Sequence, residues 1–118
     1  MRMSVAAVTQ AHPHTLKARL FYGLSHPSRV SILDALRAGP LTVTGIARVT
    51  GLGQSNVSNH LRSLKAADLV TSEQVGRSVL YQLSDERVSM LLRLAEEYLA
   101  ELTKSAYESA RESLTGRR

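Results

Sequence analysis

One segment of the chain combines a single apolar stripe with a polar face suited to hydrogen bonding with DNA bases. Val57, Leu61 and Leu64 recur at i, i+4 and i+7, which places them on one face of an α-helix. The opposite face carries short polar side chains and one guanidinium: Gln54, Ser55, Asn56, Ser58, Asn59 and Arg62. Gln and Asn pair with adenine, Ser bonds to any base, and Arg reaches guanine or phosphate. The segment therefore predicts a base-reading helix, with a solvated amphipathic helix as the alternative.

Positive charge is concentrated in the part of the chain that contains this helix. The 118 residues carry a net charge of +5. Residues 1–82 hold nine Lys or Arg and three acidic residues, whereas residues 83–118 hold six basic and seven acidic residues. A basic field beside a polar reading surface is what attraction to phosphate requires. The distribution favours double-stranded DNA as the partner.

Length and composition exclude several classes of protein. The chain is long enough for one domain and too short for two ordinary ones. It contains no cysteine, which excludes disulfides, thiolate metal sites and thiol switches. No apolar run approaches the roughly 18 to 20 residues of a membrane span, and the N-terminus lacks a signal-peptide core. We expect a soluble, cytoplasmic protein without a membrane partner.

Apolar spacing, capping residues and glycines divide the first part of the chain into a tail and short helices. Residues 1–12 are expected to form a flexible tail. The expected helices cover residues 13–23, 27–38, 46–50 and 54–67. Their starts are indicated by helix-initiating or N-capping residues: Pro13, Ser25 or His26, and Thr42 or Thr44. The turn 51–53 joins the last two helices, which predicts a helix-turn-helix motif.

Two β-prone runs, 69–74 and 78–83, follow the base-reading helix. They flank Gly76 and Arg77, a pattern typical of a hairpin with a cation at its tip. Such a tip lies along the phosphate backbone or enters a narrow minor groove. We therefore predict a mainly α fold with a small β-hairpin, a winged helix-turn-helix domain over residues 13–83.

A long amphipathic helix is predicted for residues 84–114, with Ser84 as its cap. Its apolar stripe comprises Val88, Leu91, Leu92, Ala95, Leu99 and Leu102. A helix this long and apolar exceeds what a small winged domain covers. We predict that it forms a homodimer interface together with Leu16 and Leu20 of the first helix. The alternative is that the stripe packs onto its own domain.

With these segments in place, the chain resembles the ArsR/SmtB family of bacterial winged-helix transcription regulators over residues 16–102. The matching segments are 24–33, 39–47, 54–64 and 76–83. The resemblance implies a homodimer with long terminal dimerisation helices that binds a palindromic DNA operator. It implies a repressor released by an effector, which in many members is a metal ion.

The chain departs from the family at both familiar metal sites. Thr42 and Thr44 replace a Cys-x-Cys pair of many metal-responsive relatives. A second family site, between the long helices, maps onto Asp85, Arg87, Tyr98 and Glu101. Asp85 keeps the family's Asp, and Glu101 places an acid at the last position. Arg87 and Tyr98 stand where the family has histidines. The guanidinium of Arg87 would repel a metal, and it could instead pair with Glu101 across the dimer.

The remaining histidines leave the signal open. His12 and His14, with acids from a neighbouring long helix, could bind nickel or zinc through an N/O ligand set. The alternatives are incidental histidines, an organic effector, or a sensing partner protein. His26 and His60 are expected to have structural or DNA-facing roles.

The sequence offers no catalytic constellation. The turn 51–53 lacks the remaining glycine and the lysine of a phosphate-binding loop. Ser58 and His60 are two residues apart on a helix, so their side chains diverge. We therefore predict that the protein is not an enzyme, and the remaining competitor is a helical dimerisation module that does not bind DNA.

Overall fold

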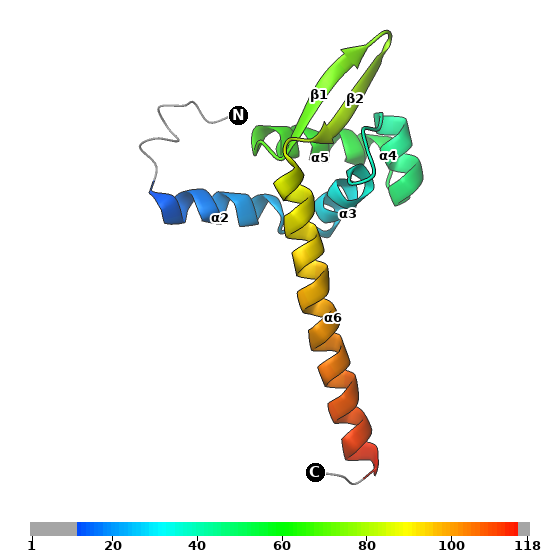
Figure 1. Cartoon of the computed structure of the whole chain (residues 1–118). Helices are drawn as coiled ribbons and strands as arrows, with labels where there is room; N and C mark the ends of the chain where they lie inside the picture. The colour runs from blue at the N-terminus through cyan, green and yellow to red at the C-terminus, as the bar shows by residue number, and fades with distance from the viewer. Residues whose placement is uncertain (1–11, 116–118) are drawn as a thin grey trace.

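The computed structural model describes residues 12–115. Within them it contains five helices and one two-stranded antiparallel sheet (Figure 1). The elements are α2 (Pro13–Gly23), α3 (Pro27–Leu36), α4 (Val43–Thr50), α5 (Gln54–Ala66), β1 (Val70–Val75), β2 (Ser78–Leu83) and α6 (Glu86–Thr115). The predicted mainly α fold with a β-hairpin wing and a long terminal helix is confirmed. The predicted tail falls outside the described residues except for His12.

The core lies where α3, α4 and α5 meet the base of the hairpin and the start of α6. Its most buried side chains come from all of these elements: Ile32, Leu33, Leu36, Ile46, Val57, Leu61, Leu64, Leu69, Val70, Val88 and Leu92. The predicted apolar stripe of α5 is part of this core, with Val57 and Leu64 at 0% exposure. Burial of such side chains is the main favourable contribution to folding.

Helix α4 begins three residues earlier than the sequence indicated. The Thr42 hydroxyl accepts a hydrogen bond from Gly45 N at 3.1 Å, so the helix starts directly after this cap. Gly45 lies inside the helix instead of before it. The helix ends at Gly51, whose φ of 77° is readily adopted only by glycine.

Helix α5 ends in a way that turns the chain into the wing. Asp68 has a φ of 60°, and the next residue, Leu69, donates its N–H to Leu64 O at 2.9 Å. This 6→1 bond and the bond from Asp68 N to Lys65 O form a Schellman motif. Strand β1 then pairs with β2, with Val70 opposite Leu83 and Val75 opposite Ser78.

The predicted cap of α6 is wrong by one residue. The Ser84 hydroxyl donates to Asp68 O at 2.7 Å, so it ties the chain to the end of α5 instead of capping the helix. The Asp85 carboxylate accepts from Arg87 N at 2.8 Å and thereby caps the first turn. A carboxylate at this end also favours the positive end of the helix dipole.

The two terminal helices project from this body (Figure 1). Every residue of α6 from Arg93 to Leu114 is exposed. Of the predicted interface stripe, Val88 and Leu92 are 7% exposed and belong to the core of their own domain. The exposed members are Leu91, Ala95, Leu99 and Leu102, and on α2 Leu16 and Leu20 are half-buried. The stripe thus divides into an anchor within the chain and an uncovered face.

Across residues 12–115, none of the helices has the length and apolar character needed to cross a membrane.

Candidate nucleic-acid interface

The six predicted reading residues of α5 all lie on its exposed side. Gln54, Ser55, Asn56, Ser58, Asn59 and Arg62 are exposed, whereas Val57, Leu61 and Leu64 on the inner face are at most 1% exposed. Arg62 donates to Asn59 Oδ1 at 3.2 Å along the helix surface. No acidic residue occurs between Gln54 and Ala66. The helix therefore presents donors, acceptors and a guanidinium without a repelling carboxylate.

The helix-turn-helix connection fixes how α5 leaves the body. The Thr50 hydroxyl donates to Ile46 O at 2.8 Å and accepts from Leu52 N at 3.2 Å. Leu52 packs against the core, which holds the turn down between α4 and α5. Gly53 precedes α5 and supplies no side-chain cap, so the first N–H groups of the helix remain available to an anion.

The wing extends from the end of α5 and carries a cation at its tip. Gly76 and Arg77 form the two-residue loop, with a positive φ of 61° at Gly76, as a type II′ turn requires. Arg77 is exposed. The Gln74 side chain donates to Gly76 O at 2.9 Å, which tightens the tip. A two-residue loop of this kind leaves the Arg77 side chain free to reach a phosphate.

Lys65 links the wing to α5, a contact that the sequence did not indicate. Its Nζ donates to Ser72 Oγ on β1 at 2.6 Å. Because the two residues lie in different elements, no periodicity connects them. The bond is a direct side-chain contact between the hairpin and α5.

His26 and His60 meet at the junction of α3 and α5. Their ring centroids are 4.6 Å apart, and His26 Nδ1 accepts from Ser28 N at 3.1 Å as the cap of α3. Burial lowers the pKa of the His60 imidazole, and the positive charges of His26 and Arg29 lower it further. The shift favours the neutral form of His60 at the contact between α3 and α5. These contacts are compatible with the predicted structural or DNA-facing roles of both histidines.

The residues at the family's second metal site do not fit a metal ion in this chain. The Asp85 carboxylate accepts from Arg87 Nε at 2.9 Å and from its NH2 at 2.8 Å. This pairing holds the pKa of Asp85 well below its usual range. The one Asp that the family pattern retains is therefore engaged by a cation that has no lone pair to offer. Arg87 pairs with Asp85 of its own chain, and the pairing with Glu101 across the dimer stays a prediction.

The candidate nickel or zinc ligands occupy a helix start instead of a tail. His12 Nδ1 accepts from His14 N at 3.2 Å and caps α2, and the two ring centroids are 4.8 Å apart. His14 lies within the helix because Pro13 at its first position is pre-organised for helical backbone. Within residues 12–115 of a single chain, no three His, Cys, Asp or Glu side chains cluster as metal ligands. A site completed by a second subunit stays a prediction.

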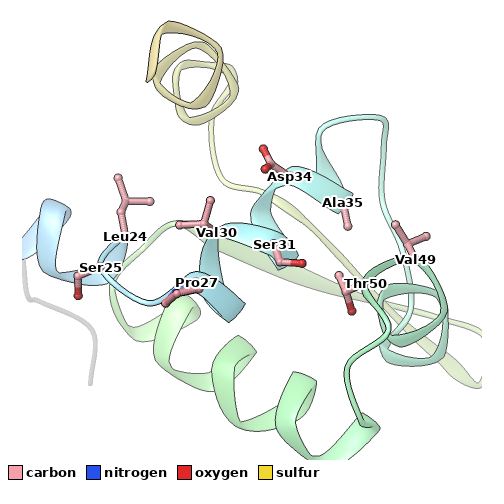
Figure 2. A pocket seen from close by; sticks show the side chains of 9 residues that line it. All are labelled: Leu24, Ser25, Pro27, Val30, Ser31, Asp34, Ala35, Val49 and Thr50. Atoms are coloured by element: carbon pink, nitrogen blue, oxygen red, sulfur yellow. The ribbon is translucent and has the colours of Figure 1, made fainter. Parts of the chain in front are cut away.

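An open hollow lies on a different side of the body (Figure 2). It has a volume of about 720 Å³ and runs between the end of α2, α3 and the end of α4. Figure 2 shows Leu24, Val30 and Asp34 directed away from α5. None of the predicted reading residues lines it. The hollow is thus separate from the polar face of α5.

Comparison with known proteins agrees with this geometry. Residues 26–72 match the model of the family described as bacterial regulatory protein, arsR family. The chain is 45% identical over 75 residues to the HTH-type transcriptional regulator NmtR of Mycobacterium tuberculosis, a match that covers 64% of this chain and 62% of that protein. It is 34% identical over 76 residues to the HTH-type transcriptional regulator YgaV of Escherichia coli, covering 64% of this chain and 77% of that protein.

A solved structure extends the comparison to the fold. The solution NMR structure of the homodimeric winged helix-turn-helix DNA-binding domain Mb0332 from Mycobacterium bovis superposes with a TM-score of 0.73. The two chains are 27% identical, and the match covers 87% of this chain and 93% of that one. That protein is described as a possible ArsR-family transcriptional regulator. By sequence and by fold, the chain belongs to the ArsR family of bacterial regulatory proteins.

Proposed function

We propose that the protein is a sequence-specific DNA-binding transcriptional regulator that binds a palindromic operator as a homodimer. The observation that carries the proposal is the division of α5 into a buried apolar face and an exposed face of six polar side chains. This is the composition of a recognition helix in the major groove. The family to which the chain belongs supports the same function.

The polar face of α5 matches the hydrogen-bonding groups of base edges. Gln54 and Asn59 can pair with adenine, Ser58 with either base type, and Arg62 with guanine or phosphate. Arg77 at the tip of the wing would contact the adjacent backbone or minor groove. Base contacts from the helix give specificity, and the wing contributes affinity for any sequence.

The homodimer is supported by the uncovered apolar side chains on the terminal helices. Tyr98 and Leu99 are 65% and 57% exposed, and on α2 Phe21 and Tyr22 are 59% and 73% exposed. A second copy of the chain would cover such a patch symmetrically. The two reading helices would then contact half-sites about one DNA turn, roughly 34 Å, apart.

A matched pair of serine variants tests the reading face. Ser58→Ala removes an exposed hydroxyl from α5, and Ser105→Ala removes an exposed hydroxyl from α6. We expect Ser58→Ala to cost about 1–3 kcal/mol at a specific operator, with relaxed base preference, because one base contact is lost in each half-site. Ser105→Ala should bind like the wild type.

Binding would be measured by fluorescence anisotropy on the operator selected from random duplexes by the wild-type protein. Equal affinity and equal base preference for Ser58→Ala and wild type would contradict the assigned reading face. A wild-type protein that selects no sequence, while remaining dimeric, would instead identify the helical dimerisation module.

A further inference from the structure

Arg37 connects two parts of the molecule through one branched side chain. One part is the reading body, by which we mean α3, α4, α5 and the hairpin, and the other is the long helix α6. It lies at the end of α3, and its Nε donates to Ser89 Oγ at 3.3 Å. Its NH1 donates to Asp34 Oδ1 at 3.3 Å and to the carboxylate of Glu96. Ser89 and Glu96 lie on α6, 52 and 59 residues further along the chain. The contact therefore joins two distant parts of the sequence.

The contact attaches α6 at a point beyond its buried first turns. Val88 and Leu92 fix the first turns of α6 in the core. Glu96 lies one turn beyond Leu92, on the part of the helix that is otherwise exposed. The core contacts of Val88 and Leu92 hold the first turns of α6, and an attachment one turn further along restrains the direction of the exposed part. The planar, forked guanidinium is well suited to such a restraint.

The charge needed for this restraint is constant. The hydrogen bond that Arg37 donates to the Glu96 carboxylate raises the pKa of Arg37, opposed in part by burial. Arg37 is therefore cationic throughout the physiological pH range. The side chain of Arg37 is only 25% exposed, whereas those of Asp34 and Glu96 are 47% and 60% exposed.

We propose that Arg37 is a positioning residue that sets the angle between α6 and the reading body, and thereby the spacing of the two recognition helices in the homodimer. The inference rests on the proposed function, because α6 carries the exposed dimer face and α5 the reading face. Neighbouring base pairs are about 3.4 Å apart along DNA. A small change in the α6 angle, applied in both subunits, shifts the two helices relative to this repeat.

The test compares two ion pairs that involve α6. One joins it to Arg37 at the end of α3, and the other lies within α6 itself. Arg37→Gln and Glu96→Gln each remove the ion pair that lies one turn beyond Leu92, while changing the net charge in opposite directions. Glu96→Gln leaves the bond from Arg37 to Ser89, so it isolates the ion pair. Arg93→Gln is the matched control, because Arg93 pairs with Glu97 at 3.8 Å within α6 and touches no other element through that pair. Exposed ion pairs contribute little to stability, so none of the three variants should unfold.

The measurement is affinity for operators whose half-site separation is changed by one or two base pairs. We expect the wild type and Arg93→Gln to prefer one separation strongly. Arg37→Gln and Glu96→Gln should bind that separation three- to tenfold more weakly and should reduce the preference over the altered separations at least threefold. Sedimentation should show the same dimer dissociation constant for all four proteins.

Each other outcome has a defined meaning. An unchanged separation preference in Arg37→Gln and Glu96→Gln, with dimers intact, would overturn the inference and leave the proposed function standing. A loss in Arg37→Gln but not in Glu96→Gln would also overturn it, because a lost positive charge would explain the result. A wild-type protein without sequence preference would refute the proposed function itself.

Discussion

The reading body and the helix α6 differ in how far their apolar side chains are buried. In the body, Ile32, Leu33 and Ile46 are completely buried by residues of the same chain. The helix α6 has 30 residues, and its side chains Leu94 and Leu99 are 63% and 57% exposed. A helix that is apolar along one side and uncovered requires a partner surface. The comparison indicates that the body buries its core within one chain, whereas the apolar side of α6 is left uncovered.

The boundary between the two regions lies within α6 itself. Leu92 is 7% exposed and packs in the core, and two turns later Leu99 is 57% exposed. Both belong to the same apolar stripe, so periodicity alone assigns them the same role. Their different surroundings mean that equal substitutions should have unequal consequences.

Substituting these two leucines by glutamate is the strongest test of the boundary. Leu99→Glu should leave the monomer folded and raise the dimer dissociation constant by more than about 100-fold. A Glu kept neutral in the interface at pH 7 costs about 3.7 kcal/mol, given its ordinary pKa of about 4.3. Leu92→Glu should instead unfold or severely destabilise each chain, because the same cost falls on the core. Sedimentation and urea unfolding, respectively, measure the two effects.

Leu114→Glu provides the control for the added charge. Leu114 is 89% exposed near the end of α6, beyond the predicted stripe, so neither folding nor dimerisation should change. A Leu99→Glu protein that remains dimeric at micromolar concentration would show that the exposed stripe is not the interface.

Within the body, the wing and α5 differ in what they would read from DNA. Arg77→Ala should weaken specific and non-specific binding by similar factors, because a phosphate contact carries little sequence information. Loss of one contact per subunit should reduce the magnitude of the salt slope, d log K/d log[salt], by about 2. Anisotropy titrations between 50 and 200 mM salt, on operator and on random duplex, measure both quantities.

The reading helix again supplies the comparison. Ser58→Ala should lose affinity only on the operator and keep the wild-type salt slope. If Arg77→Ala lost affinity at a single base pair and kept its slope, the wing would be a base reader, and the distinction between the two elements would fail.

Local patterns were enough to predict the order of the elements of the body and the exposed side of α5. The stripe of Val57, Leu61 and Leu64 predicted which side of α5 is exposed, because a helix has one period and one buried face. Gly76 predicted the hairpin turn, because glycine readily adopts the positive φ that the turn requires. The cap of α6 was misplaced because Ser84 and Asp85 are both good caps, and only the bond from Ser84 to Asp68 decides between them.

Contacts between distant segments could not be predicted from such patterns. Arg37 meets Glu96 only because the core brings the end of α3 against α6. The proximity of His26 to His60 likewise depends on the packing of α3 against α5. The difference in burial between Leu92 and Leu99 depends on where the body ends along α6. The apolar periodicity is the same on both sides of that point and does not indicate it. The least predictable residues are thus those that connect the two regions.

The junction of α3 and α5 provides the smallest expected effect. Because burial and the nearby cations lower the pKa of His60, the unfolded chain binds a proton at this site more readily than the folded chain. The associated stability is fully present above the unfolded pKa of about 6.5 and is lost as the pH falls below it. The urea midpoint of the wild type should therefore be lower at pH 5.5 than at pH 7.5.

His60→Gln isolates this contribution from other groups that titrate in the same range. It keeps a polar side chain of similar reach but cannot be protonated, so its urea midpoint should fall less between the two pH values. The difference between the two proteins, measured at a concentration that keeps both dimeric, reports on the titration of His60 and its interaction with His26. Equal falls in wild type and His60→Gln would show that protonation does not disturb the packing of α5 on α3. The pH dependence of the body would then arise elsewhere, and the reading helix would keep its position in acid.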